Sequence, residues 1–317
     1  MTRFCNAPGA SRGAIVLQHG LGSNGLVFNF PGRSLVQVLA ACGFDCFISE
    51  LRGARGHVAR AYGLDDYLDQ DLPAIIENVQ RVSGHARIHW VGHSLGGILM
   101  MMYAIDHPDA PIDRFIAVGS ALDYRFGRSI YAQLRLLKGL VSPWLHWVPF
   151  DRLAQLNAPI AGHGPKMLPE QMNFWRENVE ARVLRRMLAR GFSAIPMRLL
   201  LDLDSTFAPS GLSRHDGQIN YLVRAHEFRL RSCLLVGTRD EQCGELTVDA
   251  TARLLSNAPK LRVARFGRTH GHAQEYGHFD LLVGKHAERE VWPTIRDFVS
   301  GVNEPVLQVR ERDGALP

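Results

Sequence analysis

The 317-residue chain lacks any long uninterrupted apolar run. None of its apolar segments reaches the ~18 residues that a membrane-spanning helix needs. Residues 1–9 also lack the apolar centre of a signal peptide. We therefore expect a cytoplasmic protein without a transmembrane segment. Hydrophobic residues make up 46% and charged residues 21% of the chain, which is ordinary for a globular protein of one large domain or a core with an insertion.

Cysteine is scarce, and its spacing does not fit a metal site. The chain has five cysteines, an odd number, at positions Cys5, Cys42, Cys46, Cys233 and Cys243. We interpret Cys42 and Cys46 as small apolar core residues. A disulfide between them is the alternative, and a zinc site there would need two further ligands that the sequence does not place. We predict that the protein uses no metal and no cofactor.

A large excess of one charge is also missing. The chain carries 36 basic and 31 acidic residues, a net charge of +5. The excess lies entirely within residues 121–220, which contain 13 Lys or Arg and 8 Asp or Glu, whereas the remainder balances at 23 against 23. A local basic excess favours transient contact with an anionic lipid surface or an acidic substrate, although a solvated helical face would look the same. No nucleic-acid-binding motif is present, so we do not expect nucleic acid as a partner.

Strand-like and helix-like segments alternate along most of the chain. Strand patterns lie at residues 13–18, 44–49, 87–91, 114–119, 232–237 and 260–266, and helical patterns at 34–41, 64–82, 97–105, 245–255 and 287–300. Alternation with short connections is typical of βαβ units. We predict an α/β fold with a mostly parallel sheet of about six strands flanked by helices.

The alternation stops between residues 121 and 220. Within this segment, residues 130–141 have an amphipathic helical pattern. Residues 173–190 also read as a helix, with four arginines in its second half. We predict that residues 1–120 and 221–302 form the core, that 121–220 form an inserted helical cap, and that 303–317 form a mobile tail.

A serine flanked by glycines stands between the third expected strand and its helix. Gly92, Ser94 and Gly96 have the G-x-S-x-G spacing of a nucleophile elbow, a sharp turn that raises a serine hydroxyl at its tip. Glycine is needed on both sides because so tight a turn leaves no room for side chains. The alternative is a serine that only caps the helix.

A nucleophilic serine needs a base, and the base needs an acidic partner. Asp240 follows the strand at 232–237, where a carboxylate can reach the carboxyl edge of the sheet, although a turn aspartate is the alternative. Four histidines follow the last strand: His270, His272, His278 and His286. We choose His278 as the base, with His270 and His272 as competitors, and expect His286 to be a surface residue.

The backbone N–H groups of Leu21 and Leu95 are the candidate oxyanion-hole donors. Leu95 follows the nucleophile at the start of a helix, and Leu21 lies in a glycine-rich loop, His19-Gly20-Leu21-Gly22, after the first strand. His19 could simply brace that loop. His93 is expected to pack or hydrogen-bond locally.

Together these motifs resemble the α/β-hydrolase superfamily over nearly the whole chain apart from the cap. The segments that carry the resemblance are His19–Gly22, Gly92–Gly97, Gly237–Asp240 and Gly277–Leu281. Phe44–Gly53 resembles the strand and Arg-Gly turn of acid and gastric-type lipases. Gly277–Gly284, followed by Val291-Trp292-Pro293, resembles the histidine motif that those lipases share with polyhydroxyalkanoate synthases. Those synthases use cysteine in the elbow, so Ser94 argues against polymer synthesis. The gastric-type elbow usually has glutamine where this chain has Leu95.

The resemblance implies an α/β-hydrolase fold and a cofactor-independent serine hydrolase. We expect cleavage of carboxylic esters with lipid-like acyl groups through an acyl-enzyme, by Ser94, His278 and Asp240. A thioesterase, an acyltransferase or a serine peptidase could use the same triad. A non-catalytic binding protein of the same fold is the alternative from another class.

Overall fold

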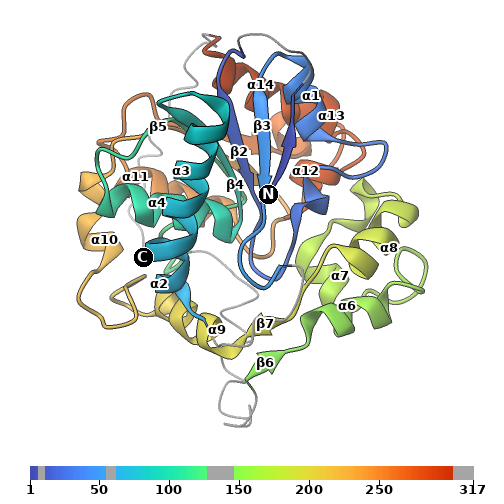
Figure 1. The fold of residues 1–317 in the computed structure, drawn as a ribbon. Coiled ribbons are helices and arrows are strands. Elements are labelled where there is room, and N and C mark those ends of the chain that lie inside the picture. Colours follow the sequence, from blue (N-terminus) through green and yellow to red (C-terminus); the bar gives the residue numbers. More distant parts are fainter. Residues whose placement is uncertain (6–10, 55–61, 127–145, 303–317) are drawn as a thin grey trace.

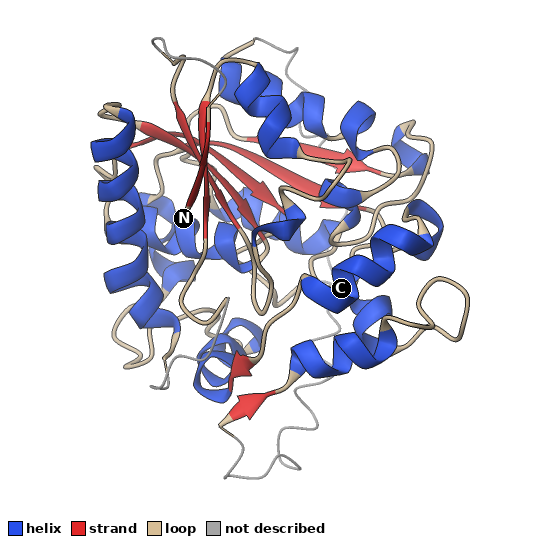
Figure 2. Ribbon diagram, turned by 45° about the vertical axis from the view of Figure 1, so that its right-hand side comes forward, coloured by secondary structure: helices blue, strands red, loops and turns tan. Residues whose placement is uncertain are grey.

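A seven-stranded sheet forms the centre of the protein. The computed structural model describes residues 1–5, 11–54, 62–126 and 146–302. The strands run in the order β1-β3-β2-β4-β5-β8-β9, and every neighbouring pair except β1 and β3 is parallel. Their bounds are β1 Thr2–Phe4, β2 Ala14–Gln18, β3 Asp45–Ser49, β4 Ile88–His93, β5 Ile112–Val118, β8 Arg231–Gly237 and β9 Arg262–Phe266. The predicted mostly parallel sheet flanked by helices is confirmed (Figures 1 and 2).

The sheet has one more strand than the six that the sequence pattern predicts. The additional strand is β1, a three-residue antiparallel edge strand in which Thr2 is the register partner of Ile48. Three residues are too few to show an alternating pattern. Tertiary contacts hold the strand instead, because the Arg3 guanidinium forms an ion pair of 2.8 Å with the buried Asp45 carboxylate.

Helices cover both faces of the sheet. Alternate side chains of the parallel strands point to opposite faces, and both sets are buried. One face packs on α3 (Leu72–Ser83), α4 (Leu95–Asp106), α10 (Tyr221–Arg224) and α11 (Glu245–Leu254). The other packs on α1 (Leu35–Ala41), α12 (Asp280–Val283), α13 (Ala287–Glu290) and α14 (Trp292–Ser300). The result is a three-layer arrangement in which the sheet lies between two layers of helices.

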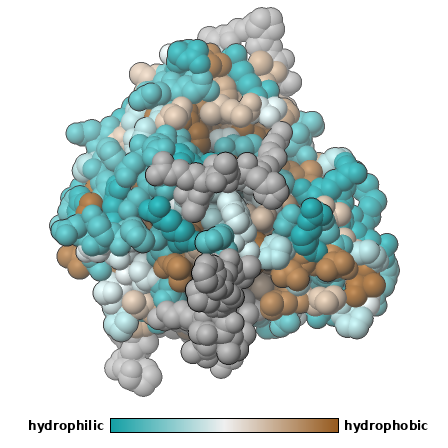
Figure 3. Space-filling model, turned by 60° about the horizontal axis from the view of Figure 1, so that its bottom comes forward, coloured by the Kyte–Doolittle hydropathy of each residue, from teal (hydrophilic) through white to brown (hydrophobic). Residues whose placement is uncertain are grey.

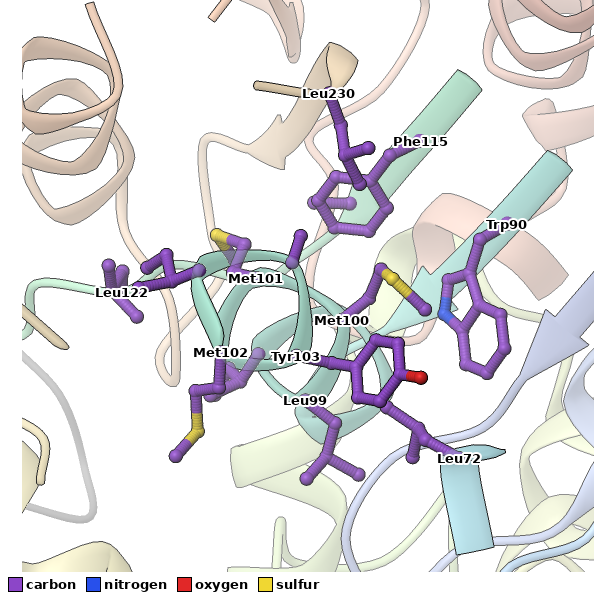
Figure 4. Close-up of a cluster of buried hydrophobic side chains, with 14 of the residues drawn as sticks. Leu72, Trp90, Leu99, Met100, Met101, Met102, Tyr103, Phe115, Leu122 and Leu230 are labelled. Atoms are coloured by element: carbon purple, nitrogen blue, oxygen red, sulfur yellow. The ribbon is translucent and has the colours of Figure 1, made fainter. Parts of the chain in front are cut away.

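Helix α4 is apolar on every side, as its sequence predicts. All residues from Leu95 to Ile105 are buried, with Met100, Met101 and Met102 fully enclosed. Figure 4 shows Met100 between Trp90 and Phe115 of the neighbouring strands, while Met102 points away from them on the other side of the helix. The helix that begins directly after Ser94 is therefore anchored along its whole length.

The predicted helix at 64–82 is broken into three parts. A short α2 (Leu64–Asp66) leads into a π-helical turn (Tyr67–Asp71), and α3 then starts at Leu72. Pro73 lies in the first turn of α3, where a missing N–H costs no helical hydrogen bond. The N-cap of α2 is Gly63, and the Asp66 carboxylate accepts a hydrogen bond from the Gly63 N–H.

An insertion lies between β5 and β8, at residues 119–230. Its described part contains α6 (Phe150–Asn157), α7 (Leu168–Asn173), α8 (Ala181–Arg190), α9 (Met197–Asp204) and the short antiparallel pair β6 (Trp147–Val148) and β7 (Ile195–Pro196). The predicted helix at 130–141 lies outside the described residues. The predicted continuous helix at 173–190 is wrong in its first half, because only residues 181–190 form α8.

His89 makes stability depend on pH. It is a buried residue of β4, and burial lowers its pKa from 6.5 to about 4, although the nearby Asp113 carboxylate opposes this. Because the folded-state pKa is the lower one, the stabilisation by neutral His89 is present above pH 6.5 and is lost as the pH falls towards 4. A difference of this size is worth about 3 kcal/mol. We expect His89→Gln to lose less stability than the wild type between pH 6.5 and 4 in urea unfolding. Equal losses would contradict this assignment.

Candidate active site

Ser94 occupies a strained turn between β4 and α4. Its backbone has φ 53° and ψ −123°, a left-handed value of φ that a non-glycine residue rarely adopts. A Cβ added to Gly92 would lie 2.5 Å from the Gly96 carbonyl carbon, and one added to Gly96 would lie 2.4 Å from the Gln18 carbonyl oxygen. Glycine is therefore required at both positions, and the turn has the geometry expected of a nucleophile elbow.

Asp240 and His278 form a buried pair at the same edge of the sheet. Asp240 Oδ2 lies 2.8 Å from His278 Nδ1, and both side chains are almost fully enclosed. Asp240 Oδ1 accepts hydrogen bonds from the N–H groups of Gln242 and Cys243, which fix the carboxylate. His278 Nε2 is buried and has no hydrogen-bond partner among the described residues. The imidazole is held by Nδ1, so Nε2 remains open to a reacting group.

Contacts of the strand ends bring this pair next to the elbow. The Ser94 N–H donates to the Val118 carbonyl at the end of β5. The following residue, Gly119, approaches the pair so closely that an added Cβ would lie 3.0 Å from both Asp240 Oδ2 and His278 Nδ1. The ring of His93, which precedes Ser94, packs on the ring of His278 at 4.6 Å between centroids. The elbow, the carboxylate and the imidazole therefore meet at the carboxyl ends of β4, β5 and β8.

The other candidate bases make different contacts. His270 Nε2 lies 3.0 Å from Glu245 Oε1, and His272 Nδ1 lies 3.2 Å from the Gly267 carbonyl. His286 forms the N-cap position of α13. The structure thus brings His278, and not these three, to Asp240.

A change of Asp240 to asparagine tests the role of the pair. The amide oxygen of the introduced asparagine would keep the two backbone hydrogen bonds, and its NH2 group would face His278 Nδ1. Nδ1 would then have to accept, which places the proton on Nε2 and removes the base from the side that faces the nucleophile. We expect Asp240→Asn to lower kcat for ester hydrolysis by ~10⁴-fold with an unchanged fold. Asp216→Asn, a change on the exposed surface, is the control. Retention of more than a tenth of the activity in Asp240→Asn would contradict the assignment.

The loop after β2 lies directly against Ser94. A Cβ on Gly20 would lie 2.6 Å from Ser94 Cβ and 3.2 Å from Ser94 Oγ. No described residue accepts a hydrogen bond from the Leu21 N–H, and Leu95 opens α4. His19 braces the loop: its Nδ1 contacts the Gly20 carbonyl at 2.9 Å, and its Nε2 accepts from the Leu51 N–H at 3.2 Å. Both predicted donors therefore border the serine.

Two further polar residues, His93 and Asp280, lie beside the site, and neither was predicted to be catalytic. His93 is completely buried, and its Nε2 contacts the His278 carbonyl at 3.2 Å. Burial lowers the pKa of His93 well below 6.5, and the neighbouring His278 acts in the same direction, so His93 stays neutral. We predicted that His93 packs or hydrogen-bonds locally; it does both, but with His278, which is distant in the sequence. Asp280 is the second, and the sequence showed only its place in the histidine motif.

Asp280 connects the histidine loop to the insertion. One carboxylate oxygen, Oδ2, accepts hydrogen bonds of 3.0 Å from the Gly277 N–H and from the Trp175 N–H. Burial raises the pKa of Asp280 well above its usual value, and the charge of Asp240 adds to this. The Phe279 N–H donates to the Asn173 carbonyl. The Asn173 carbonyl and the Trp175 N–H thus bond to the histidine loop, and α7 ends at Asn173 instead of continuing into the helix predicted at 173–190.

A narrow cavity lies beside the His19 loop. Its volume is about 10 Å³, and its walls come from residues 19–23, 52–54, Tyr62, Tyr67, 193–196 and Leu199. This is barely the space for one water molecule, so an acyl chain can enter it only if residues of the insertion or the tyrosines move. Among the described residues, no cluster of three or more His, Cys, Asp or Glu could hold a metal ion. No described helix is long and apolar enough to cross a membrane.

Comparison with known proteins agrees with this architecture. Residues 13–148 match a family model described as the alpha/beta hydrolase fold. A monoacylglycerol lipase from Paleococcus ferrophilus has a similar structure, with a TM-score of 0.62 and 18% identity over 95% of this chain and 97% of that one. The chain is therefore an α/β-hydrolase-fold protein.

Curated proteins that are similar to this chain in sequence include lipases. It is 29% identical to human lipase member K over 150 residues, which cover 43% of this chain and 38% of the relative. It is 28% identical to human gastric triacylglycerol lipase over 141 residues, or 40% of this chain and 35% of the relative. The matches thus span little more than a third of the length of these relatives.

Proposed function

We propose that the protein is a serine hydrolase that cleaves carboxylic esters of lipid-like substrates through an acyl-enzyme. The observation that carries this proposal is the buried Asp240–His278 pair, whose Nε2 has no hydrogen-bond partner among the described residues, at the same edge of the sheet as the strained Ser94 turn. The lipase relatives support the same class of chemistry.

The mechanism follows from the roles of these side chains. Ser94 Oγ attacks the ester carbonyl while His278 Nε2 takes its proton, and Asp240 stabilises the imidazolium that forms. His278 then gives the proton to the leaving alcohol, and the acyl group stays on Ser94. Water, deprotonated by His278, cleaves the acyl-enzyme and releases the acid. The N–H groups of Leu21 and Leu95 stabilise the negative oxygen in both tetrahedral intermediates.

The surface of the insertion supports a lipid-like substrate. Five large apolar side chains around α6 and α7 are exposed: Leu153, Leu156, Ile160, Met167 and Leu168. Apolar atoms gather over this part of the surface (Figure 3). Such a patch suits contact with a lipid surface, and the exposed Arg152 and Lys166, which pair with Asp151 and Glu177, lie on the same part of the insertion. We propose that residues 121–220 act as a cap that presents this patch to the lipid.

Removal of one apolar side chain tests the patch. Leu156 has an exposed fraction of 76%, and Leu246, on α11, has 62%. Burial of a leucine side chain in a lipid surface is worth ~1.5–3 kcal/mol. We expect Leu156→Asp to weaken binding to anionic vesicles at least about tenfold in a sedimentation assay, with no change for a soluble short-chain ester. Leu246→Asp is the matched control. Equal effects of the two changes would contradict the proposal.

Assays with different substrates distinguish the other reactions that the same triad could catalyse. A panel of p-nitrophenyl esters of increasing chain length, beside acyl thioesters and aminoacyl amides, distinguishes an esterase from a thioesterase and a peptidase. Added alcohol as a competing acceptor reveals an acyltransferase. A non-catalytic binding protein would give no covalent adduct at Ser94 with a fluorophosphonate probe, and that result in folded protein would overturn the proposed function.

A further inference from the structure

A second, larger groove lies away from the catalytic residues. Its volume is about 580 Å³, within the range of small-molecule sites. It is formed by the edge strand β1, the end of β3, the turn η1 (Gly25–Val27) and helix α8. Its lining residues include Phe4, Leu26, Asn29, Ile48, Arg186 and Arg190. Ser94, Asp240 and His278 are not among them, so the groove is distinct from the candidate active site.

Two arginines and an asparagine supply hydrogen-bond donors at this groove. Arg186 and Arg190 form no ion pair with any described residue. Arg186 packs over the Phe30 ring at 5.7 Å, and its Nε is buried without a hydrogen-bond partner within the described part of the chain. Asn29 Oδ1 accepts from the Ser34 hydroxyl, which leaves the Asn29 amide NH2 as a donor. Two cations and an amide donor are complementary to an anion.

Carboxylates in this part of the molecule have partners of their own. Glu50 accepts a hydrogen bond from the Gly25 N–H at 3.2 Å and contacts His19 Nε2 at 3.2 Å. Several other arginines are paired with carboxylates, such as Arg33 with Glu180 and Arg176 with Glu170. Arg186 and Arg190 therefore differ from these arginines, because they line a groove without an ion pair to a described residue.

The remaining wall of the groove is apolar. Phe4, Leu26 and Ile48 lie beside the donors. Ile48 is almost fully buried, and Phe4 and Leu26 pack against the same core cluster. A free inorganic anion would contact only the arginines and Asn29, whereas a molecule with an anionic head and an alkyl chain would contact both kinds of wall.

We propose that this groove is a second ligand site that binds an amphipathic anion, with its carboxylate or phosphate head on Arg186 and Arg190 and its alkyl chain along Phe4, Leu26 and Ile48. Long-chain fatty acids and lipid phosphate monoesters share this chemistry. The ligand would bridge the core and the insertion, because Asn24 Nδ2 already donates to the Arg190 carbonyl at 2.8 Å and α8 contacts η1.

Calorimetric titration of the full chain with dodecyl phosphate tests the proposal. We expect the dissociation constant to rise at least about 30-fold in Arg186→Gln/Arg190→Gln, since the charge-assisted hydrogen bonds to the anionic head are lost. The matched control is Arg182→Gln/Arg289→Gln, which removes two exposed cations outside the groove. Dodecanoate in place of dodecyl phosphate distinguishes a fatty acid from a lipid phosphate. Inorganic phosphate and dodecanol should each bind at least about tenfold more weakly than the better amphiphile.

Two further variants keep the test decisive. Arg186→Gln could loosen the packing on Phe30, so Arg190→Gln alone, at an exposed position, must also weaken binding. Leu26→Asp should weaken dodecyl phosphate more than inorganic phosphate. The proposal is overturned if the double arginine variant and its control lose affinity for dodecyl phosphate equally. It is also overturned if both Arg190→Gln and the double variant keep full affinity. Equal affinity for inorganic phosphate and dodecyl phosphate would overturn the amphipathic ligand.

Discussion

Ester hydrolysis by the Ser94→Ala variant is expected to fall by ~10⁵–10⁶-fold in kcat. The loss is this large because no other group can form the acyl-enzyme, and only the oxyanion donors and substrate binding remain. The fold should be unaffected, since Ser94 adopts its left-handed φ through the turn around it and alanine has the same Cβ. The measurement is initial-rate kinetics on a p-nitrophenyl ester together with labelling by a fluorophosphonate.

The control for Ser94 is Ser120, a buried serine close by. Its hydroxyl donates to the Ser94 carbonyl at 2.8 Å, so Ser120→Ala changes the support of the turn without removing the nucleophile. We expect Ser120→Ala to keep its covalent label. An unchanged label in Ser94→Ala, or the absence of label in the wild type, would show that Ser94 is not the nucleophile.

The His278→Ala variant is expected to lose ~10⁵–10⁶-fold in kcat, about as much as Ser94→Ala, because serine and base act as one unit. The double variant should be no worse than either single one, which is the signature of a shared step. Labelling by a fluorophosphonate should also slow strongly, since Ser94 would lose the group that takes its proton.

His272 provides the matched control for this base. It is also a histidine of the loop after β9, but its ring contacts Phe266 and the Gly267 carbonyl instead of Asp240. We expect His272→Ala to stay within about fivefold of the wild type. If His272→Ala loses activity while His278→Ala keeps it, the assignment of the base is wrong.

The parts of the fold that follow periodicity could be predicted from the sequence. The parallel strands and helix α4 carry long apolar patterns, and their buried residues form the two layers of the core. Strand β1 could not be found this way, because its three residues are held by pairing with β3 and by the Arg3–Asp45 ion pair. The π-helical turn before Pro73 was also missed, since a proline signals a break but not the shape of the turn.

The candidate site, too, could be predicted from the sequence only in part. Ser94, Asp240 and His278 follow from chemistry and chain order, because strand ends of a parallel sheet gather at one edge. The contacts of His93 with His278 and of Asp280 with Trp175 join residues far apart in the chain, and no local pattern reports such contacts. The walls of the narrow cavity come mainly from loops and from the insertion, for the same reason.

The hydrogen bonds of Asp280 have a consequence for changing the substrate range. Residues 173–178 form hydrogen bonds with Asp280, Phe279 and Lys285. This stretch of the insertion therefore helps to hold the loop that carries His278. A chimaera that exchanges the whole insertion would also displace His278. The exchange should instead spare residues 172–180 and vary α6 and α9, where the exposed and cavity-facing side chains lie. Such an exchange would vary the exposed and cavity-facing side chains while keeping the contacts that hold the Asp240–His278 pair.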